Sequence, residues 1–470
     1  MNKTNHPSAF IPYPSYKDSG VAWLGDVPKY WEMRKFRTIL TPIAERNRPD
    51  LPLLSVVREK GVIERNIKDD SENYNYIPDD LSNYKIVKSG QFAMNKMKAW
   101  QGSYGISKFH GIVSPAYFVF DLKCIEPGFF HKAVRSRAYV PFFTQASDGV
   151  RVGQWDLSQT RMKEIPFGVP SIPEQTQIAR FLDYKTAQIA RFIKAKKRMI
   201  ELLKEQKQVI INDAVTGKIV IKDEGGRLKV EKRPDSSFIP HPSSFLQTVP
   251  GGWEVRRLKD IFSNMNTKRV PLSGVQRGMM KTHEYNYYGA SGIIDKVDDY
   301  IFDDDLLLIA EDGANLVLRN LPLAIIARGK FWVNNHAHIL KPKIGSIEFY
   351  AHLLESVNYL PWISGAAQPK LTQDRLMAIR VSVPSEKEQL FILKWIKNNT
   401  QSLDLAISRT EREIALMQEY RTRLISDVVT GKIDVRDIEI PDIAGIDDTI
   451  DESIDEPEGE EELETAEAEE

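Results

Sequence analysis

The stretch "IPEQTQIARFLDYKTAQIARFIKAKKRMIELLKEQKQVIINDAVTGKI" (residues 172–219) decides how this chain should fold. Its apolar residues recur at heptad spacing, which predicts one long amphipathic helix. Pro173 and Glu174 suit the first helical turn, and Gly217 suits the left-handed residue that follows a helix end. The helix should cover about 35 residues, or roughly 50 Å at 1.5 Å per residue. Its packing residues are Leu182, Ile189, Leu203 and Ile210 in one row, with Ile178, Phe192 and Met199 in the next.

The same pattern returns 214 residues later and ends on the same letters, "VTGKI", at 429–433. The second packing row is Ile396, Leu403, Met417 and Leu424. A helix of this length with a single apolar stripe needs a partner, and its own duplicate is the nearest one. We therefore expect a two-helix coiled coil that acts as a spacer. The alternative is two separate helices, each capping its own globular module.

Earlier parts of the chain repeat as well. "LSQTRMKEIPFGVPSIPEQTQI" (157–178) matches "LTQDRLMAIRVSVPSEKEQLFI" (371–392), and "VPKYWEMRKF" (27–36) matches "VPGGWEVRRL" (249–258). "FIPYPS" (10–15) likewise matches "FIPHPS" (238–243). The segments between these blocks show no sequence match. A tandem duplication with divergent inserts indicates one scaffold that presents two different surfaces.

A nucleotide-binding interpretation of "VTGKI" fails. A phosphate loop needs G-x-x-x-x-G-K-[ST] after a strand. Here Asn212 stands where the first glycine should be, Ile219 follows Lys218, and a helix precedes the motif. Lys218 and Lys432 lie instead near the negative end of a helix dipole.

Composition indicates a soluble chain with room for two or three domains in its 470 residues. It has no run of 18 apolar residues and no apolar stretch near its first residue, so we expect neither a membrane partner nor a secretory signal. A single cysteine, Cys124, excludes an internal disulfide and a cysteine-rich zinc site. A cytoplasmic location fits best.

The net charge of −1 hides an asymmetry. Residues 437–470 hold 17 acidic residues and no Lys or Arg, so residues 1–436 carry 64 basic against 48 acidic residues, a charge of +16. Such an excess suits a polyanionic partner, although a solvated basic surface is the plain alternative. We expect the tail to be disordered and to compete within the chain for the basic surface.

Each module offers a set of candidate DNA-binding residues. In the first, "NKMKAWQGSYGIS" (95–107) mixes basic, amide and aromatic residues with glycines, which suits contacts to phosphates and base edges, although an ordinary surface hairpin would look similar. In the second, the candidates lie between turn clusters and short strands. The full set is Lys96, Lys98, Trp100, Gln101, Ser103, Tyr288, Arg328, Lys330, Asn334 and His336.

Metal and catalytic sites are weakly supported. His336 and His338 would share a strand face, but no third ligand pattern lies near, so a hydrogen-bonded histidine is favoured. The acidic run Asp303–Asp305 and the pair Glu311 and Asp312 suit solvated strand ends better than a metal site. No Walker A, G-x-G-x-x-G, H-E-x-x-H or G-x-S-x-G motif occurs, and no Pro-Pro dipeptide, so the methyltransferase tetrad is missing. We expect no catalytic residues and no bound metal.

The plan resembles the specificity (S) subunit of type I restriction–modification systems. The marks are "YKDSGVAWLGDVPKYWE" (16–32), "YYGASGIID" (287–295), "FWVNNHAHIL" (331–340), "GAAQPKLTQDRL" (365–376) and the paired "EQ…TGKI" helices. The resemblance implies an α+β fold: two mixed α/β target recognition domains, joined by two long antiparallel coiled-coil helices, in an internal pseudo-twofold repeat. The expected segments are a leader (1–26), recognition domain 1 (27–170), spacer helix 1 (171–219), a linker with the second leader (220–248), recognition domain 2 (249–384), spacer helix 2 (385–433) and the acidic tail (434–470).

The resemblance also implies the function. Each recognition domain would read one half of a bipartite, asymmetric sequence in double-stranded DNA, and the helices would fix the gap and dock two modification (methyltransferase) subunits. Restriction (translocase/endonuclease) subunits would join the complex. The chain itself would be non-catalytic and bind no cofactor, because S-adenosylmethionine, ATP and Mg²⁺ belong to those partners. The alternatives are a coiled-coil scaffold or DNA-binding protein outside restriction, and a single-chain methyltransferase or nuclease.

Overall fold

The computed structural model describes residues 11–58, 60–65, 77–78, 80–151, 154–225, 227–240, 248–365 and 368–441. They divide into two compact units, each mixing helices and strands. Unit 1 runs up to residue 198 and resumes at 410, and unit 2 comprises 199–409. The acidic tail from 442 onward lies outside the described residues. No described helix combines the length and apolarity that crossing a membrane requires.

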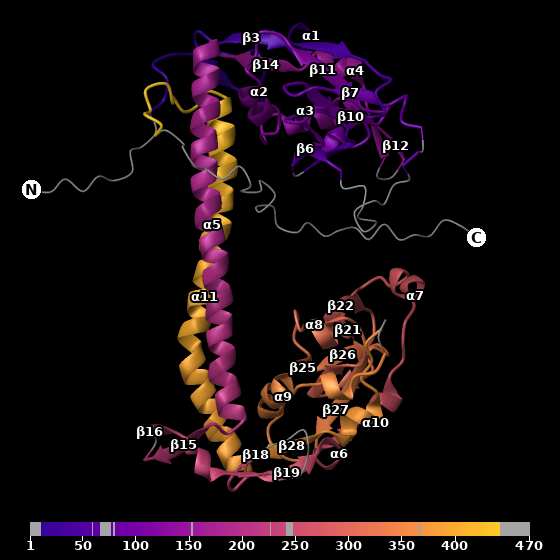
Figure 1. Cartoon of the computed structure of the whole chain (residues 1–470), viewed down its shortest axis with the longest axis vertical. Helices are drawn as coiled ribbons and strands as arrows, with labels where there is room; N and C mark the ends of the chain where they lie inside the picture. Colours follow the sequence, from indigo (N-terminus) through magenta and orange to yellow (C-terminus); the bar gives the residue numbers. More distant parts are fainter. Residues whose placement is uncertain are drawn as a thin grey trace, which may run out of the picture. The chain divides into compact units, whose positions relative to one another are not determined.

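Two long helices dominate Figure 1: α5 (Ile172–Val215) and α11 (Glu386–Val429). Each has 44 residues, more than the 35 or so expected, because the helix continues beyond the heptad rows at both ends. Gly217 and Gly431 do adopt the left-handed conformation, at φ 73° and 77°. The prediction that "VTGKI" marks a helix end is confirmed.

The two helices pair antiparallel within each unit. In unit 1, Lys196 Nζ lies 2.7 Å from Glu413 Oε2, and Leu182 shares a core with Leu424, so residue numbers rise on α5 as they fall on α11. In unit 2, Lys207 Nζ lies 2.5 Å from Asp404 Oδ1. The predicted coiled coil is confirmed, and the alternative of two separate caps is excluded.

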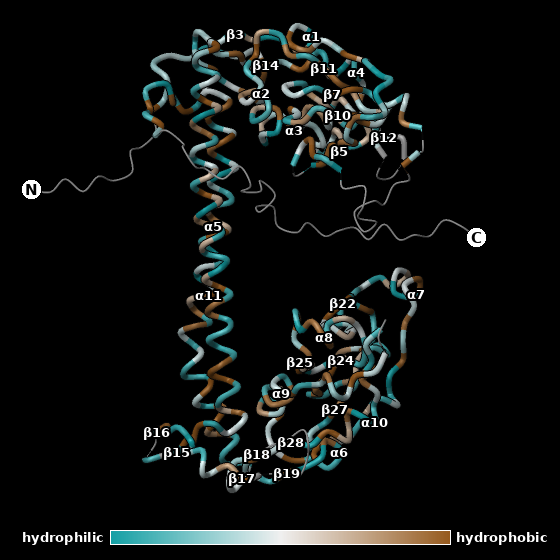
Figure 2. Tube along the Cα trace, in the orientation of Figure 1, coloured by the Kyte–Doolittle hydropathy of each residue, from teal (hydrophilic) through white to brown (hydrophobic). Residues whose placement is uncertain are grey.

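The seam between the helices is narrow, and apolar residues alternate with hydrophilic ones along both (Figure 2). Of the predicted packing residues, Leu182, Ile189, Ile396 and Leu424 are buried, and Leu203, Ile210, Leu403 and Met417 are half-buried. Phe192 and Met199 were wrongly predicted to pack: they are 39% and 43% exposed. One partner helix covers only one narrow stripe, so a second apolar row faces outward.

Unit 1 is built on an antiparallel four-stranded sheet in the order β4-β11-β8-β9, and five further antiparallel strand pairs surround it. Those pairs are β1–β2, β3–β14, β5–β6, β7–β10 and β12–β13. The strands are β1 Tyr16–Asp18, β2 Asp26–Pro28, β3 Glu32–Lys35, β4 Leu40–Ile43, β5 Leu54–Val57, β6 Gly61–Glu64, β7 Lys85–Val87, β8 Phe92–Met94, β9 Tyr104–Ile106, β10 Gly111–Val113, β11 Phe118–Leu122, β12 Ser147–Arg151, β13 Gln154–Leu157 and β14 Pro166–Val169. The helices are α1 Phe36–Ile39, η1 Ala99–Gln101, α2 Pro127–Val134, α3 Val140–Gln145 and α4 Gln159–Lys163.

Unit 2 has two four-stranded sheets, β20-β27-β24-β25 and β22-β21-β26-β23, the second with one parallel pair, β21–β26. Strands β15–β16, β17–β18 and β19–β28 form antiparallel pairs. The strands are β15 Ile219–Glu224, β16 Arg227–Lys232, β17 Phe238–Pro240, β18 Thr248–Pro250, β19 Glu254–Arg257, β20 Phe262–Asn264, β21 Tyr285–Gly289, β22 Gly292–Val297, β23 Phe302–Asp303, β24 Leu306–Ala310, β25 Ala324–Ala327, β26 Lys330–Val333, β27 Ala337–Pro342 and β28 Arg380–Val383. The helices are η2 Asp235–Ser237, α6 Leu258–Ile261, η3 Asn266–Lys268, α7 Gly274–Gly278, α8 Asn315–Leu318, α9 Ile347–Ser356, η4 Leu360–Trp362 and α10 Gln373–Ala378.

The duplication reaches the modules although their sequences do not match. The sheet β4-β11-β8-β9 of unit 1 and the sheet β20-β27-β24-β25 of unit 2 have the same topology: ranked by position in the chain, the neighbouring strands are the first, fourth, second and third. In both, a short helix, α1 or α6, leads into the first strand, and a longer helix, α2 or α9, follows the last strand, β11 or β27. The expected α+β fold with an internal repeat is confirmed.

The "EQ" letters of the repeat lock each long helix to its module. Gln175 Oε1 accepts the Glu126 N–H at 2.7 Å just before α2, and Gln389 Oε1 accepts the Ser346 N–H at 3.0 Å just before α9. Both glutamines are buried. The same side chain therefore fixes the start of the equivalent helix in each unit.

Candidate nucleic-acid interface

The equivalent sheets identify equivalent surface loops. In unit 1, the loop between β8 and β9 (residues 95–103) is the predicted DNA-binding loop. In unit 2, the loop between β24 and β25 (residues 311–323) takes the same place. A second segment follows in each unit, directly before α4 or α10: the strand pair β12–β13 in unit 1, and residues 363–365 with 368–371 in unit 2, where an antiparallel bridge joins Ser364 to Lys370. We call this segment the hairpin in both units.

Loop and hairpin are joined in the same way in both units. The Leu157 N–H donates to the Lys96 carbonyl at 3.2 Å, and the Leu371 N–H donates to the Glu311 carbonyl at 2.8 Å. Leu157 and Leu371 are equivalent residues of the repeat, 214 positions apart. Loop and hairpin therefore form one composite surface in each unit, which we call the loop–hairpin surface.

An ion pair crosses each loop–hairpin surface with its charges exchanged. In unit 1, Lys96 Nζ on the loop lies 3.1 Å from Asp156 Oδ1 on the hairpin. In unit 2, Glu311 Oε1 on the loop lies 3.4 Å from Lys370 Nζ on the hairpin. The same backbone hydrogen bond joins loop and hairpin in both units. The basic residue of the ion pair, however, lies on the loop in unit 1 and on the hairpin in unit 2.

In unit 1, three of the predicted residues lie where they could meet a ligand. Lys98 is exposed, Gln101 is half-buried, and Trp100 stacks on Trp155 of the hairpin with ring centroids 5.5 Å apart. Ser103 is only 2% exposed, because its carbonyl accepts the Asn95 N–H and closes the loop inward. Sequence spacing within a loop does not show which residues form its base.

In unit 2, the predicted residues separate into two groups at opposite ends of β26. Arg328 and Lys330 lie at the turn before it, where Arg328 pairs with Asp305 and Glu348, and Lys330 lies 4.6 Å from the centre of the Tyr300 ring. The hydrogen bond to Tyr300 raises the pKa of Lys330. Two carboxylates thus compensate the charge of Arg328, whereas Lys330 is held by the Tyr300 side chain.

The other group lies beside the loop–hairpin surface. His336 is exposed, and its Nδ1 lies 2.9 Å from Asp312. Asn334 is buried, and its side-chain oxygen accepts the His336 N–H at 2.8 Å, so it positions the histidine from beneath. Tyr288 is also buried, at 8% exposed, and its carbonyl accepts the Asn334 N–H.

A buried polar group holds these segments together. Glu311 Oε2 accepts from Arg269 Nη1 at 2.6 Å, and Arg269 also donates to the Ala337 carbonyl at 2.9 Å. Burial alone would raise the pKa of Glu311, but the hydrogen bond from Arg269 and the nearby positive charges outweigh it and lower that pKa. The ionised carboxylate and Arg269 thus link the end of η3, the end of β24 and the start of β27.

His338 completes this group and has no free nitrogen for a metal. Its Nε2 lies 2.7 Å from the Leu371 carbonyl, which can only accept, so Nε2 carries the proton and Nδ1 accepts from Asn266 at 2.8 Å. Burial lowers its pKa, which favours this neutral form. The favoured interpretation of His338 as a hydrogen-bonded histidine is the one that the geometry supports.

Sequence inspection missed Glu311 and Arg269 as organising residues, and Gln368 and Lys370 as exposed hairpin residues. The repeat could have indicated the two hairpin residues, because at the offset of 214 Gln368 aligns with Gln154 and Lys370 aligns with Asp156. Both aligned positions fall on the hairpin.

Residues 250–414, which contain the second loop–hairpin surface, match the profile of the type I restriction modification DNA specificity domain. Over these residues the chain is similar to the specificity subunits of type I restriction–modification systems. It is 33% identical over 156 residues to a putative type I restriction enzyme specificity subunit of Haemophilus influenzae, a match that covers 32% of this chain and 39% of that relative. It is 21% identical over 451 residues to the putative MjaX specificity subunit of Methanocaldococcus jannaschii, covering 88% of this chain and 96% of that one.

A similar fold is present in a solved structure from work on complex assembly and conformational transition of the type I R-M system. The TM-score is 0.53 at 14% identity, and the match covers 87% of this chain and 99% of the other. The fold that the resemblance implied is thereby confirmed.

Proposed function

We propose that this chain is the DNA sequence-specificity subunit of a type I restriction–modification complex, and that each unit reads one half of a bipartite target. The observation that carries the proposal is the pair of loop–hairpin surfaces, which share one framework and differ in the groups that they present. A constant framework with exchanged side chains suits the recognition of two different half-sites by direct contact to base edges.

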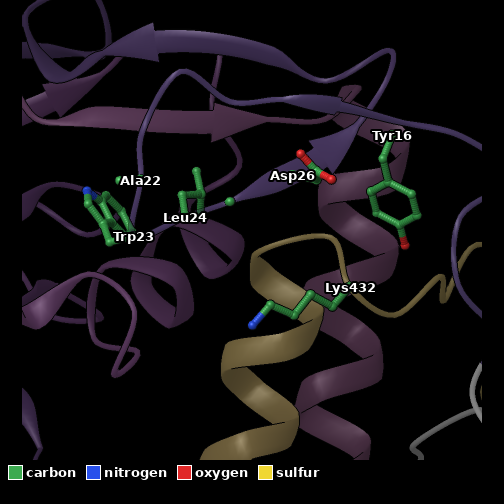
Figure 3. A pocket seen from close by; sticks show the side chains of 7 residues that line it. Tyr16, Ala22, Trp23, Leu24, Asp26 and Lys432 are labelled. Carbon is green, nitrogen blue, oxygen red and sulfur yellow. The ribbon is translucent and has the colours of Figure 1, made fainter.

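The paired helices would fix the gap between the half-sites, centred about one DNA turn apart. Their outward faces would dock the two modification subunits. In support, large apolar side chains of both helices are exposed at regular spacing: Leu202 and Val209 on α5 (48% and 53%), and Leu416 and Tyr420 on α11 (58% and 41%). Unit 1 also has an open cavity of about 480 Å³ beside the end of α11 (Figure 3). It is lined by Tyr16, residues 22–26 of the leader and Lys432.

The chain would be non-catalytic. S-adenosylmethionine, ATP and Mg²⁺ would belong to the modification and restriction subunits, and the complex would act on cytoplasmic DNA. In both copies the lysine of "VTGKI" contacts an aspartate of the preceding helix: Lys432 Nζ lies 3.4 Å from Asp427, and Lys218 Nζ lies 3.1 Å from Asp213. These contacts support a structural role for the two lysines. The candidate base-reading residues would be Lys98, Trp100 and Gln101 in unit 1, and His336 and Lys370 in unit 2.

The test is DNA binding by the chain assembled with its modification subunits. We expect sequence-specific binding whose affinity falls linearly with salt on logarithmic axes, because phosphate contacts release counterions. Equal affinity for all sequences, or none, would instead favour a coiled-coil scaffold. The purified chain alone should transfer no methyl group from labelled S-adenosylmethionine, and transfer would revive the single-chain methyltransferase.

A further inference from the structure

The loop between β24 and β25 of unit 2 presents an unusual surface. Three aliphatic side chains within five residues face solvent: Val317 is 45% exposed, Leu318 62% and Leu321 50%. Single exposed apolar residues are common, but a cluster on one short loop marks a contact surface.

Hydrogen bonds within the loop and to its surroundings fix its conformation. Asn315 closes it from both sides, since its Nδ2 donates to the Leu321 carbonyl at 3.0 Å and its Oδ1 accepts the Leu321 N–H at 2.9 Å. Arg319, at φ 53°, donates to the Val357 carbonyl at 3.0 Å, and Glu355 accepts the N–H groups of residues 323 and 324 at 2.8 and 2.9 Å. These bonds fix the loop in the conformation that leaves the three side chains exposed.

The loop adjoins polar groups suited to DNA. It begins at Asp312, which holds His336, and the Gly313 N–H donates to the Pro369 carbonyl of the hairpin at 3.1 Å. Lys370 and Gln368 are exposed on that hairpin. Figure 1 places α8 at the same end of the unit 2 module as β22, away from α6 and β28.

The equivalent loop of unit 1 has different chemistry. Its η1 segment and flanks carry Lys98, Trp100 and Gln101, with no exposed aliphatic cluster among the residues that the structure describes there. The two modules therefore present a polar and an apolar loop at the same structural position. In the major groove, the apolar group on a base edge is the 5-methyl group of thymine.

We propose that the loop Asn315–Leu321 reads thymine in the second half-site, through contact of Val317 and Leu318 with 5-methyl groups. This inference rests on the proposed function and adds the base that one module selects. The loop lies within residues 250–414, which match a DNA specificity domain, and this favours a DNA duplex as the occupant over a protein groove. We expect thymine methyl groups to add nothing to the affinity for the first half-site.

The experiment replaces thymine by uracil, which removes only the methyl group. The target is first determined by mapping the adenines that the complete system methylates. Each thymine of a duplex containing that target is then replaced in turn by deoxyuridine, and the affinity of the chain assembled with its modification subunits is measured. Replacement at one or more positions of the second half-site should weaken binding about fourfold per methyl, the effect of one buried carbon. Replacement in the first half-site should change nothing.

The variants Leu318→Ala and Val317→Ala should bind thymine and uracil duplexes with equal affinity. Leu318→Met retains bulk and should keep the discrimination, which controls for a folding defect. Ile344→Ala is the matched control, because Ile344 is also 45% exposed but lies beyond the other end of β27. It should discriminate as the unaltered chain does.

Several outcomes would overturn the inference while leaving the proposed function standing. These are specific binding that ignores every methyl group, a second half-site made only of G·C pairs, and full discrimination by Leu318→Ala. Loss of assembly with the modification subunits in Leu318→Ala would likewise overturn it, and would assign the loop to a protein contact. Absence of any sequence-specific binding by the unaltered complex would contradict the proposed function itself.

Discussion

Gly431, just past the end of α11, lies against Trp31, near the start of recognition domain 1: a Cβ on this glycine would come within 3.2 Å of the Trp31 ring and 2.4 Å of Pro28 Cδ. The equivalent Gly217, past the end of α5, meets Trp253 and Pro250, near the start of recognition domain 2, at 3.1 and 2.5 Å. The helix end of each copy thus packs on the start of the recognition domain of the other copy. This exchange is what the antiparallel pairing of the two helices requires.

Gly431→Ala should destabilise unit 1, and Gly217→Ala should destabilise unit 2. The added methyl must displace a proline and also adopt a left-handed backbone, together costing about 2 kcal/mol or more. Hydrogen exchange resolved by peptide would show which unit loses protection. Gly20→Ala is the control, since Gly20 has φ 72° but no atom within 4 Å of its Cβ position, so it should cost only the backbone strain. Equal losses at Gly20 and Gly431 would contradict the packing.

Glu174→Ala should destabilise unit 1 by about 3 kcal/mol. Glu174 is buried, and its Oε1 accepts from Tyr13 at 2.7 Å, Tyr30 at 3.0 Å and Trp31 at 3.1 Å, so truncation leaves three donors without an acceptor. Denaturant unfolding followed by tryptophan fluorescence measures the loss.

The repeat supplies the control for Glu174. Glu388 accepts the Trp253 indole N–H at 3.0 Å but is 29% exposed, so water can replace the lost acceptor. Glu388→Ala should therefore cost about 1 kcal/mol. Losses of the same size in the two variants would show that burial at Glu174 is not the deciding factor.

Unit 1 should lose stability as the pH falls below about 6.5. Burial, followed by the Arg135 charge, holds the pKa of His131 well below its usual 6.5. Its Nδ1 accepts the Ile106 N–H at 3.0 Å, which requires the neutral ring. The unfolded state then binds more protons than the folded state, so stability is complete above the unfolded pKa and declines below it.

His131→Gln tests this pH dependence, because the amide oxygen can accept the same N–H without titrating. After correction for intrinsic rates, hydrogen exchange in residues 104–106 should accelerate between pH 7 and 5 in the unaltered chain and much less in the variant. An identical pH dependence in both would remove His131 as the cause.

Most of the framework could be predicted from the sequence, because its signals are local and periodic. The heptad rows, the glycine stops and the offset of 214 give the helices and the repeat directly. The shared sheet could not be predicted, since its strands, such as β8 and β24, need only be buried and apolar, and many sequences meet that condition. The contact of Lys96 with Asp156 also escapes local patterns, because tertiary folding alone brings these residues together.

Lys96→Asp together with Asp156→Lys should reproduce in unit 1 the polarity found in unit 2. The single variant Lys96→Asp sets two carboxylates side by side and should weaken loop–hairpin packing, whereas the double variant should recover it. The pair is partly exposed, at 31% and 41%, so a double-mutant cycle should give a coupling of about 0.5–1 kcal/mol. Strictly additive effects would mean that the pair does not join the two segments.

The central claim is that each unit reads one half of the target independently. The measurement is the map of methylated adenines in a host carrying the complete system, before and after residues 254–370 are exchanged for the second module of another family member. We predict that one half of the methylated sequence changes, while the other half and the gap stay as they were. A change in both halves, or in neither, would contradict the account.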